Sequence, residues 1–175
     1  MRVALVALLA LLVAAGCGQE SVPPPPESPP SGAQAERTVE SLTEDTERLA
    51  REVAGTGRRL AQDPSSVEDA QAVLEDQERR ARELADRTRR ELPEGEPARE
   101  RLAAANERTA EAAAKLRDFA ERPEQRESLE EARESLRGTR EELGGAVEEA
   151  RERLSPGARE RLDRLREGLD RLPEL

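Results

Sequence analysis

Cysteine and histidine are the side chains that most often carry nucleophilic or metal chemistry, and this sequence has one cysteine, Cys17, and no histidine. A Cys–His or Ser–His pair for nucleophilic catalysis therefore cannot form. Transition-metal sites usually draw on the same two residue types. We accordingly expect a protein that is not an enzyme, with no catalytic residues, no metal site and no cofactor.

Carboxylates are the one reactive group in abundance, because 39 Asp and Glu residues outnumber 29 Lys and Arg residues and give a net charge of −10. So acidic a chain is repelled by nucleic acid, and we expect no nucleic-acid partner. Acidic patches could bind a divalent cation weakly or contact a basic partner. A solvated helix face explains them more simply, and we favour that interpretation. The patches comprise Glu130, Glu131, Glu134, Glu141, Glu142, Glu148 and Glu149.

The segment before Cys17 has the organisation of an export signal. Arg2 supplies a positive charge, and residues 3–15 form an unbroken apolar run. This run is well short of the ~20 residues that a helix needs to span a bilayer, so it is typical of a signal peptide. We therefore predict a signal peptide at residues 1–16.

The residues Val13-Ala14-Ala15-Gly16-Cys17 resemble the lipobox of bacterial lipoproteins. The resemblance implies that the Cys17 thiol receives a diacylglyceryl thioether and that a dedicated signal peptidase cleaves the bond between Gly16 and Cys17. It covers residues 1–17 and indicates no family for the rest of the chain. The alternative is an ordinary secreted protein, which would carry a single free thiol in an oxidising compartment.

A proline-rich stretch follows the cysteine, with Pro23 to Pro26 in succession and Pro29 beside Pro30. Consecutive prolines favour the polyproline II conformation. We predict that residues 17–34 comprise the lipidated cysteine and a disordered linker, up to about 45 Å long at ~3.1 Å per residue. Membrane lipid would be a partner through the acylated Cys17. The protein would lie on the outer face of the cytoplasmic membrane, or on the outer membrane of a diderm host.

From residue 35 onward, apolar and small residues recur at alternating steps of three and four, which is typical of helices that pack through narrow seams. The first seam includes Val39, Leu42 and Leu49, and the third includes Leu102, Ala105 and Thr109. We predict a helical domain at residues 35–173, with helices at about 35–62, 66–92, 97–121, 124–153 and 156–172. Short connections favour antiparallel neighbours. The predicted fold class is all-α: an antiparallel up-down bundle, or helical hairpins with coiled-coil-like seams, of about four long helices and a shorter C-terminal one.

Local signals refine the helix ends. Ser65 and Glu68 fit a capping box, and Pro123 is predicted at the first position of a helix.

Three glycines, which weaken helices, suggest a bend or a mobile region in the fourth helix: Gly138, Gly144 and Gly145. Four pairs spaced by four residues are expected to support the second helix: Glu75 with Arg79, Glu78 with Arg82, Glu83 with Arg87 and Asp86 with Arg90.

Polar residues occupy several seam positions that should face the interior. They could line a ligand groove, but such residues more often belong to a thin core and set the register of the helices, and we favour that interpretation. These residues are Thr46, Thr56, Gln77, Thr88, Thr109 and Thr139.

The sequence thus predicts a membrane-anchored envelope lipoprotein with a structural or protein-interaction role, whose partner is another envelope protein or a wall component. The alternative is a ligand-binding lipoprotein with a groove between its helices. Ligand pockets are usually lined with aromatic groups, and aromatic residues make up 1% of this chain. A cell-envelope hydrolase is the least supported possibility, because histidine is absent.

Overall fold

The computed structural model describes residues 32–63 and 67–169, and these form five α-helices without a β-strand. The all-α fold is therefore confirmed. The helices are α1 (Gly32–Gln62), α2 (Val67–Glu91), α3 (Pro97–Glu121), α4 (Arg126–Arg151) and α5 (Pro156–Leu169). The predicted signal peptide, Cys17, most of the linker and Ser65 of the capping box lie outside the described residues.

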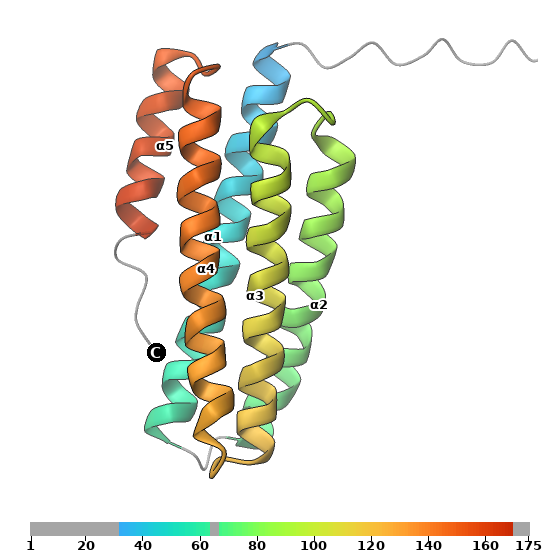
Figure 1. Cartoon of the computed structure of the whole chain (residues 1–175), viewed down its shortest axis with the longest axis vertical. Coiled ribbons are helices and arrows are strands. Elements are labelled where there is room, and N and C mark those ends of the chain that lie inside the picture. Colours follow the sequence, from blue (N-terminus) through green and yellow to red (C-terminus); the bar gives the residue numbers. More distant parts are fainter. Residues whose placement is uncertain (1–31, 64–66, 170–175) are drawn as a thin grey trace, which may run out of the picture.

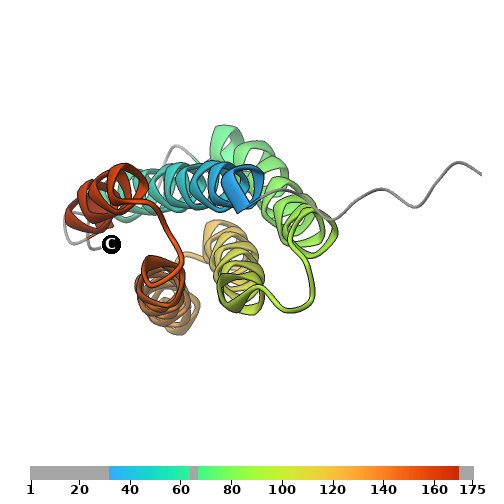
Figure 2. The ribbon, with the colours of Figure 1, turned by 90° about the horizontal axis from the view of Figure 1, so that it is seen from above.

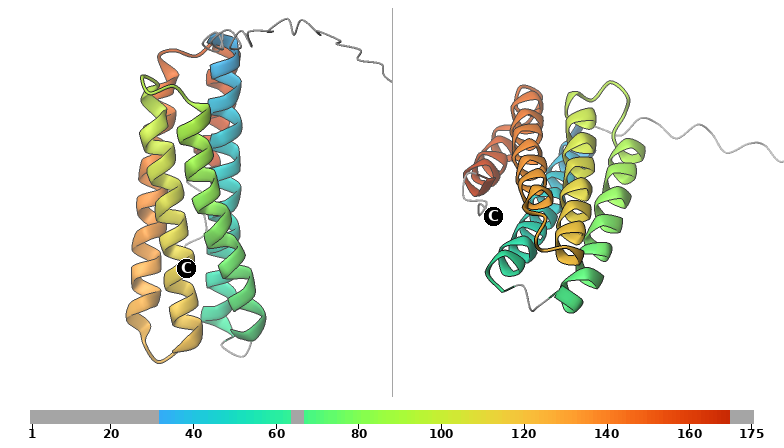
Figure 3. Two further views of the ribbon diagram at one scale, coloured as in Figure 1. Left: turned by 90° about the vertical axis from the view of Figure 1, so that its right-hand side faces the viewer. Right: turned by 60° about the horizontal axis from the view of Figure 1, so that its bottom comes forward.

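The helices run up and down, as predicted (Figure 1). Seen along the bundle, the α1–α2 hairpin lies over the α3–α4 hairpin, and α5 lies at the edge beside α1 and α4 (Figure 2). The start of α1 is at the same end as the α2–α3 and α4–α5 connections (Figures 1 and 3). We call this the upper end, following the orientation of Figure 1.

The role predicted for Pro123 is wrong. Pro123 lies in the turn between α3 and α4, and α4 begins three residues later, at Arg126. Arg122 leaves the helical region, with φ −140° and ψ 74°, because a residue that precedes proline disfavours the α conformation. By contrast, Pro97 and Pro156 do begin α3 and α5. The fourth helix also ends at Arg151 rather than at residue 153.

Two large apolar clusters lie in the bundle, one near each end, and a small third cluster of Leu49, Ala81 and Ala110 lies between them. The upper cluster joins all five helices and contains Val39, Leu42, Leu84, Leu92, Ala98, Leu102, Ala105, Leu143, Ala146, Val147, Ala150, Leu154, Ala158 and Leu162. The lower cluster joins α1 to α4 and contains Val53, Leu60, Ala70, Leu74, Ala112, Ala113, Leu116, Phe119, Ala120, Leu129 and Ala132. Alanines dominate α3, so this helix approaches its neighbours α2 and α4 closely and is the most enclosed of the five.

Candidate functional site

The residue with the clearest predicted chemistry, Cys17, and its cleavage partner Gly16 lie outside the described residues. What the structure places is the interior of the bundle and its charged surface.

The polar seam residues face inward, as predicted. Thr46, Thr88, Thr109 and Thr139 are completely buried, and Thr56 and Gln77 are nearly so. Each threonine hydroxyl donates a hydrogen bond to the carbonyl four residues earlier in its helix, for example Thr46 to Leu42 at 2.7 Å. These bonds satisfy the hydroxyl groups within their own helices, so the threonines can be buried without a ligand.

Three polar contacts connect different helices in the interior of the bundle. Asn106 Nδ2 of α3 donates to Thr46 Oγ1 of α1 at 2.9 Å, and also to the Leu102 carbonyl of its own helix at 2.8 Å. The hydroxyl oxygens of Thr109 and Thr139 approach to 3.3 Å between α3 and α4. Lower in the bundle, Gln77 Nε2 donates to Thr56 Oγ1 at 3.3 Å. These contacts tie α1, α2, α3 and α4 together in a fixed register.

Sequence reasoning missed Asn106, although it is fully buried. The predicted α3 seam runs through Leu102, Ala105 and Thr109, but a second inward stripe includes Ala103, Asn106, Ala110 and Ala113. A helix that packs against several neighbours needs two such stripes. The many alanines of α3 concealed the second stripe, because exposed and buried alanines look alike in a sequence.

Glu47 was also missed. It lies on α1 with 3% of its surface exposed and forms an ion pair with Arg51, one turn further along the helix. Burial raises the pKa of the Glu47 carboxyl above its ordinary value of 4.5, while the charge of Arg51 acts in the opposite direction. The hydrophobic pattern offered no signal for a buried carboxylate at this position.

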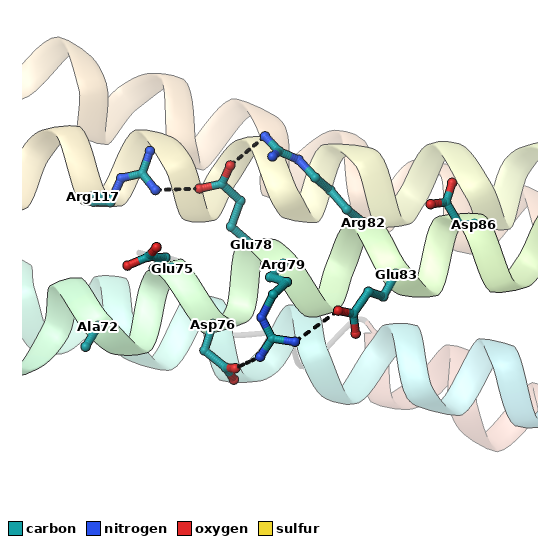
Figure 4. A pocket seen from close by; sticks show the side chains of 9 residues that line it. All are labelled: Ala72, Glu75, Asp76, Glu78, Arg79, Arg82, Glu83, Asp86 and Arg117. Atoms are coloured by element: carbon teal, nitrogen blue, oxygen red, sulfur yellow. Dashed lines mark hydrogen bonds and ion pairs between the residues drawn. The ribbon is translucent and has the colours of Figure 1, made fainter.

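The surface hollow drawn in Figure 4 has a volume of about 510 Å³ and lies along the outer side of α2, with Arg117 of α3 at its margin. Glu78 accepts a hydrogen bond from Arg117 at 2.8 Å and forms an ion pair with Arg82 at 2.5 Å. Arg79 contacts Asp76 and Glu83. The charged groups thus largely satisfy one another, and the hollow lacks the apolar lining typical of a small-molecule pocket.

These contacts also test the helix pairs that the sequence predicted. The pair of Glu78 with Arg82 is confirmed. The pair of Glu75 with Arg79 and the pair of Glu83 with Arg87 are wrong, because both arginines contact other carboxylates. Arg87 contacts Asp45 of α1 and Glu91, and Asp86 contacts Arg89 in place of Arg90.

The acidic residues of α4 are largely engaged with basic residues. Lys115 of α3 contacts Glu131 at 2.6 Å, and Arg101 contacts Glu142 at 3.1 Å and Glu149 at 2.6 Å. The hydrogen bond to Glu149 raises the pKa of Arg101. Among the described residues, no group of three or more His, Cys, Asp or Glu side chains is arranged to hold a metal ion.

Two of the three α4 glycines lie beneath arginine side chains of α3. A Cβ atom at Gly145 would come within 2.8 Å of the Arg101 side chain, and one at Gly138 within 2.6 Å of Arg108. The two glycines are seven residues apart, and so are the two arginines. The arginines therefore cross α4 at equivalent positions one heptad apart. Helix α4 is continuous through all three glycines, including Gly144.

Fold and surface together define an all-α up-down bundle with a thin, partly polar core. The chain matches no protein-family model, and comparison with curated proteins and with solved structures gave no match either. Within residues 32–63 and 67–169, no helix is long and apolar enough to cross a membrane.

Proposed function

We propose that this protein is an envelope lipoprotein, anchored by an acylated Cys17, whose helical bundle has a structural or protein-interaction role and no enzymatic activity. One observation carries the proposal: the single cysteine stands where an apolar export signal ends, in a sequence that resembles a lipobox. A free thiol at this position would be unusual in an exported protein, whereas a lipid anchor requires one.

The bundle is compatible with an anchored arrangement. Helix α1 begins at Gly32, only 15 residues after Cys17, so the anchor would join the bundle at its upper end. The lower end, with the turn between α3 and α4, would then lie farther from the membrane. A helix of 25 residues is about 38 Å long at 1.5 Å per residue, so the bundle and linker together could reach well into the envelope.

An interaction role fits the character of the surface. Among the residues whose side-chain exposure the structure describes, Val73 is the only exposed large hydrophobic side chain, at 43%. The described surface carries many arginine and carboxylate side chains, which form ion pairs both within helices and between neighbouring helices. Such a surface favours contacts with polar or charged envelope components over burial in lipid.

A ligand-binding role is the second candidate, and one observation favours it. A recess of about 170 Å³ lies between α1 and α2, where Thr56, Arg59 and Val73 line it. It is smaller than the ~300–1,000 Å³ of typical ligand pockets, and no aromatic side chain lines it. We therefore place this role behind interaction with an envelope partner.

Crosslinking in intact cells tests the interaction role. Native protein and a Cys17→Ser variant, expressed at equal levels, would be crosslinked and purified, and the captured proteins compared. The proposal predicts one or more envelope partners that are enriched with the native protein and reduced with the variant. Equal recovery of the same partners from both, or none from the native protein, would contradict it.

A further inference from the structure

Helix α5 packs against the upper end of the bundle through residues 156–164, the part of the helix whose side chains the structure describes. Its neighbours are the beginning of α1 and the end of α4, and it lies beside both in Figures 1 and 2. Ala158 and Leu162 are 1% exposed and belong to the upper apolar cluster, together with Leu154 of the preceding turn. Among residues 156–164, whose side chains the structure describes, none belongs to the lower cluster.

Polar contacts fasten the same region to the first turns of α1. The Arg161 guanidinium binds both carboxylate oxygens of Glu40, with Nη2 at 3.0 Å from Oε2. One turn earlier in α1, the Glu36 carboxylate accepts hydrogen bonds from the backbone nitrogen of Ser155 at 3.2 Å and from its hydroxyl at 3.0 Å. Both carboxylates therefore bind groups that lie about 120 residues away in the sequence.

The contacts of Glu40 and Glu36 fix the orientation of the groups that they join. An arginine that uses two nitrogens on one carboxylate is held in orientation as well as in distance. The Glu40 side chain is 14% exposed, so water competes less for this ion pair than for most on the surface. The hydrogen bond to Glu40 also raises the pKa of Arg161. A third contact, Arg151 with Asp163 at 3.6 Å, joins α5 to α4.

The middle of the bundle, between this region and the lower half, is only partly apolar. The buried polar side chains of Asn106, Thr46, Thr109 and Thr139 lie there, with a small apolar cluster of Leu49, Ala81 and Ala110. A 14-residue helix is also too short to be stable by itself, so its helical state depends on what it packs against.

We propose that α5 is a clasp that fastens the first turns of α1 to the end of α4, and that the clasp and these turns open together as a unit distinct from the lower half of the bundle. Local opening of this kind is common in proteins and follows packing units. The clasp holds the turns of α1 that continue into the predicted linker. If the chain is anchored through Cys17, the clasp would resist force transmitted from the membrane, and this role rests on the proposed lipid anchor. The clasp as a packing unit does not depend on the anchor.

Hydrogen exchange measured by mass spectrometry on the full chain in detergent tests the proposal. Arg161→Glu replaces the attraction to Glu40 by repulsion. Arg164→Glu is the matched control, because it makes the same charge change on the same helix at a side chain that is 68% exposed. Among the described residues, Arg164 contacts Glu160 of its own helix and no residue of α1 or α4. Exchange would be followed in segments 36–46 and 156–164 of the clasp and in segment 112–120 of the lower cluster.

The proposal predicts that Arg161→Glu speeds exchange about three- to tenfold in the two clasp segments and leaves segment 112–120 unchanged. Arg164→Glu should leave all three segments unchanged. Adding Glu40→Arg to Arg161→Glu restores the ion pair with reversed charges and should restore slow exchange. If folding fails with the charge reversal, Arg161→Gln should give the same pattern with a smaller increase.

Uniform acceleration in all three segments, or no difference between Arg161→Glu and Arg164→Glu, would overturn the clasp. The same measurements on a Cys17→Ser background should give the same pattern. Hydrogen exchange therefore tests the clasp, and the modification of Cys17 is tested by a different experiment.

Discussion

Asn106 of α3 donates a hydrogen bond to Thr46 of α1 across 2.9 Å, with both side chains fully buried near the middle of the bundle. The Asn106 Oδ1 atom has no hydrogen-bond partner within the protein. An unpartnered buried acceptor costs stability, whereas a single buried asparagine can specify how helices align. We interpret this contact as a device for register, placed between two apolar clusters that would tolerate several alignments.

Replacing Asn106 by aspartate should be strongly destabilising. The substitution removes the donor to Thr46 and places a carboxylate in an apolar interior, and the expected loss is about 3 kcal/mol or more at pH 7. Burial raises the pKa of such a carboxyl, so stability should recover as pH falls and the group is protonated. Urea unfolding at several pH values measures the effect. Asn106→Leu is the comparison and should change stability by less than about 1.5 kcal/mol.

The buried Glu47 gives a prediction for pH. Its pKa is higher in the folded protein than its ordinary value of 4.5, so its contribution to stability is fully present below pH 4.5 and is lost as pH rises through the folded-state pKa. Glu47→Gln should therefore be more stable than the native protein at pH 7 to 8, and its advantage should shrink toward pH 4. A difference that stays constant with pH, or grows on acidification, would contradict this assignment.

Two adjacent glycines of α4 should respond differently to alanine. A Cβ atom at Gly144 meets nothing within 4 Å, so Gly144→Ala should stabilise the protein by about 0.5–1 kcal/mol through helix propensity. A Cβ at Gly145 would displace Arg101 from Glu142 and Glu149, which offsets this gain. Chemical unfolding of the two variants measures the difference. Equal stabilisation would show that Arg101 moves aside without cost.

Glu78 and Glu75 line the same hollow and differ in their partners (Figure 4). Glu78 is 7% exposed and binds Arg82 and Arg117, so Glu78→Gln should lower the free energy of unfolding by about 1–2 kcal/mol. Glu75 is exposed, so Glu75→Gln should change it by less than about 0.5 kcal/mol. Thermal unfolding of the two variants compares them directly, and equal effects would remove any special role from the contact between α2 and α3.

Apolar periodicity and prolines predicted the helices well, because each signal is local. The first predicted seam, which includes Val39, Leu42 and Leu49, is buried throughout. The prolines were less certain guides, since Pro97 begins a helix whereas Pro123 lies in a turn. A proline fits both positions equally well, and only the path of the chain between α3 and α4 decides between them.

Contacts between helices could not be predicted in the same way. The ion pair of Arg161 with Glu40 and the placement of Arg101 over Gly145 depend on register between helices distant in the sequence. In a chain with this many arginines and carboxylates, many pairings are equally compatible with the sequence, and packing selects among them. Cys17 is the opposite case. Because the sequence has a single cysteine, the proposed lipid attachment can be assigned to one residue.

Mass spectrometry of the mature N-terminus tests the central claim most directly. The protein would be purified in detergent from its native host, and its N-terminal peptide would be analysed. We predict a chain that begins at Cys17 and carries a diacylglyceryl group on the thiol, with loss of both the modification and the cleavage in a Cys17→Ser variant. A mature chain with an unmodified Cys17 thiol, or one cleaved at a different bond, would contradict the account.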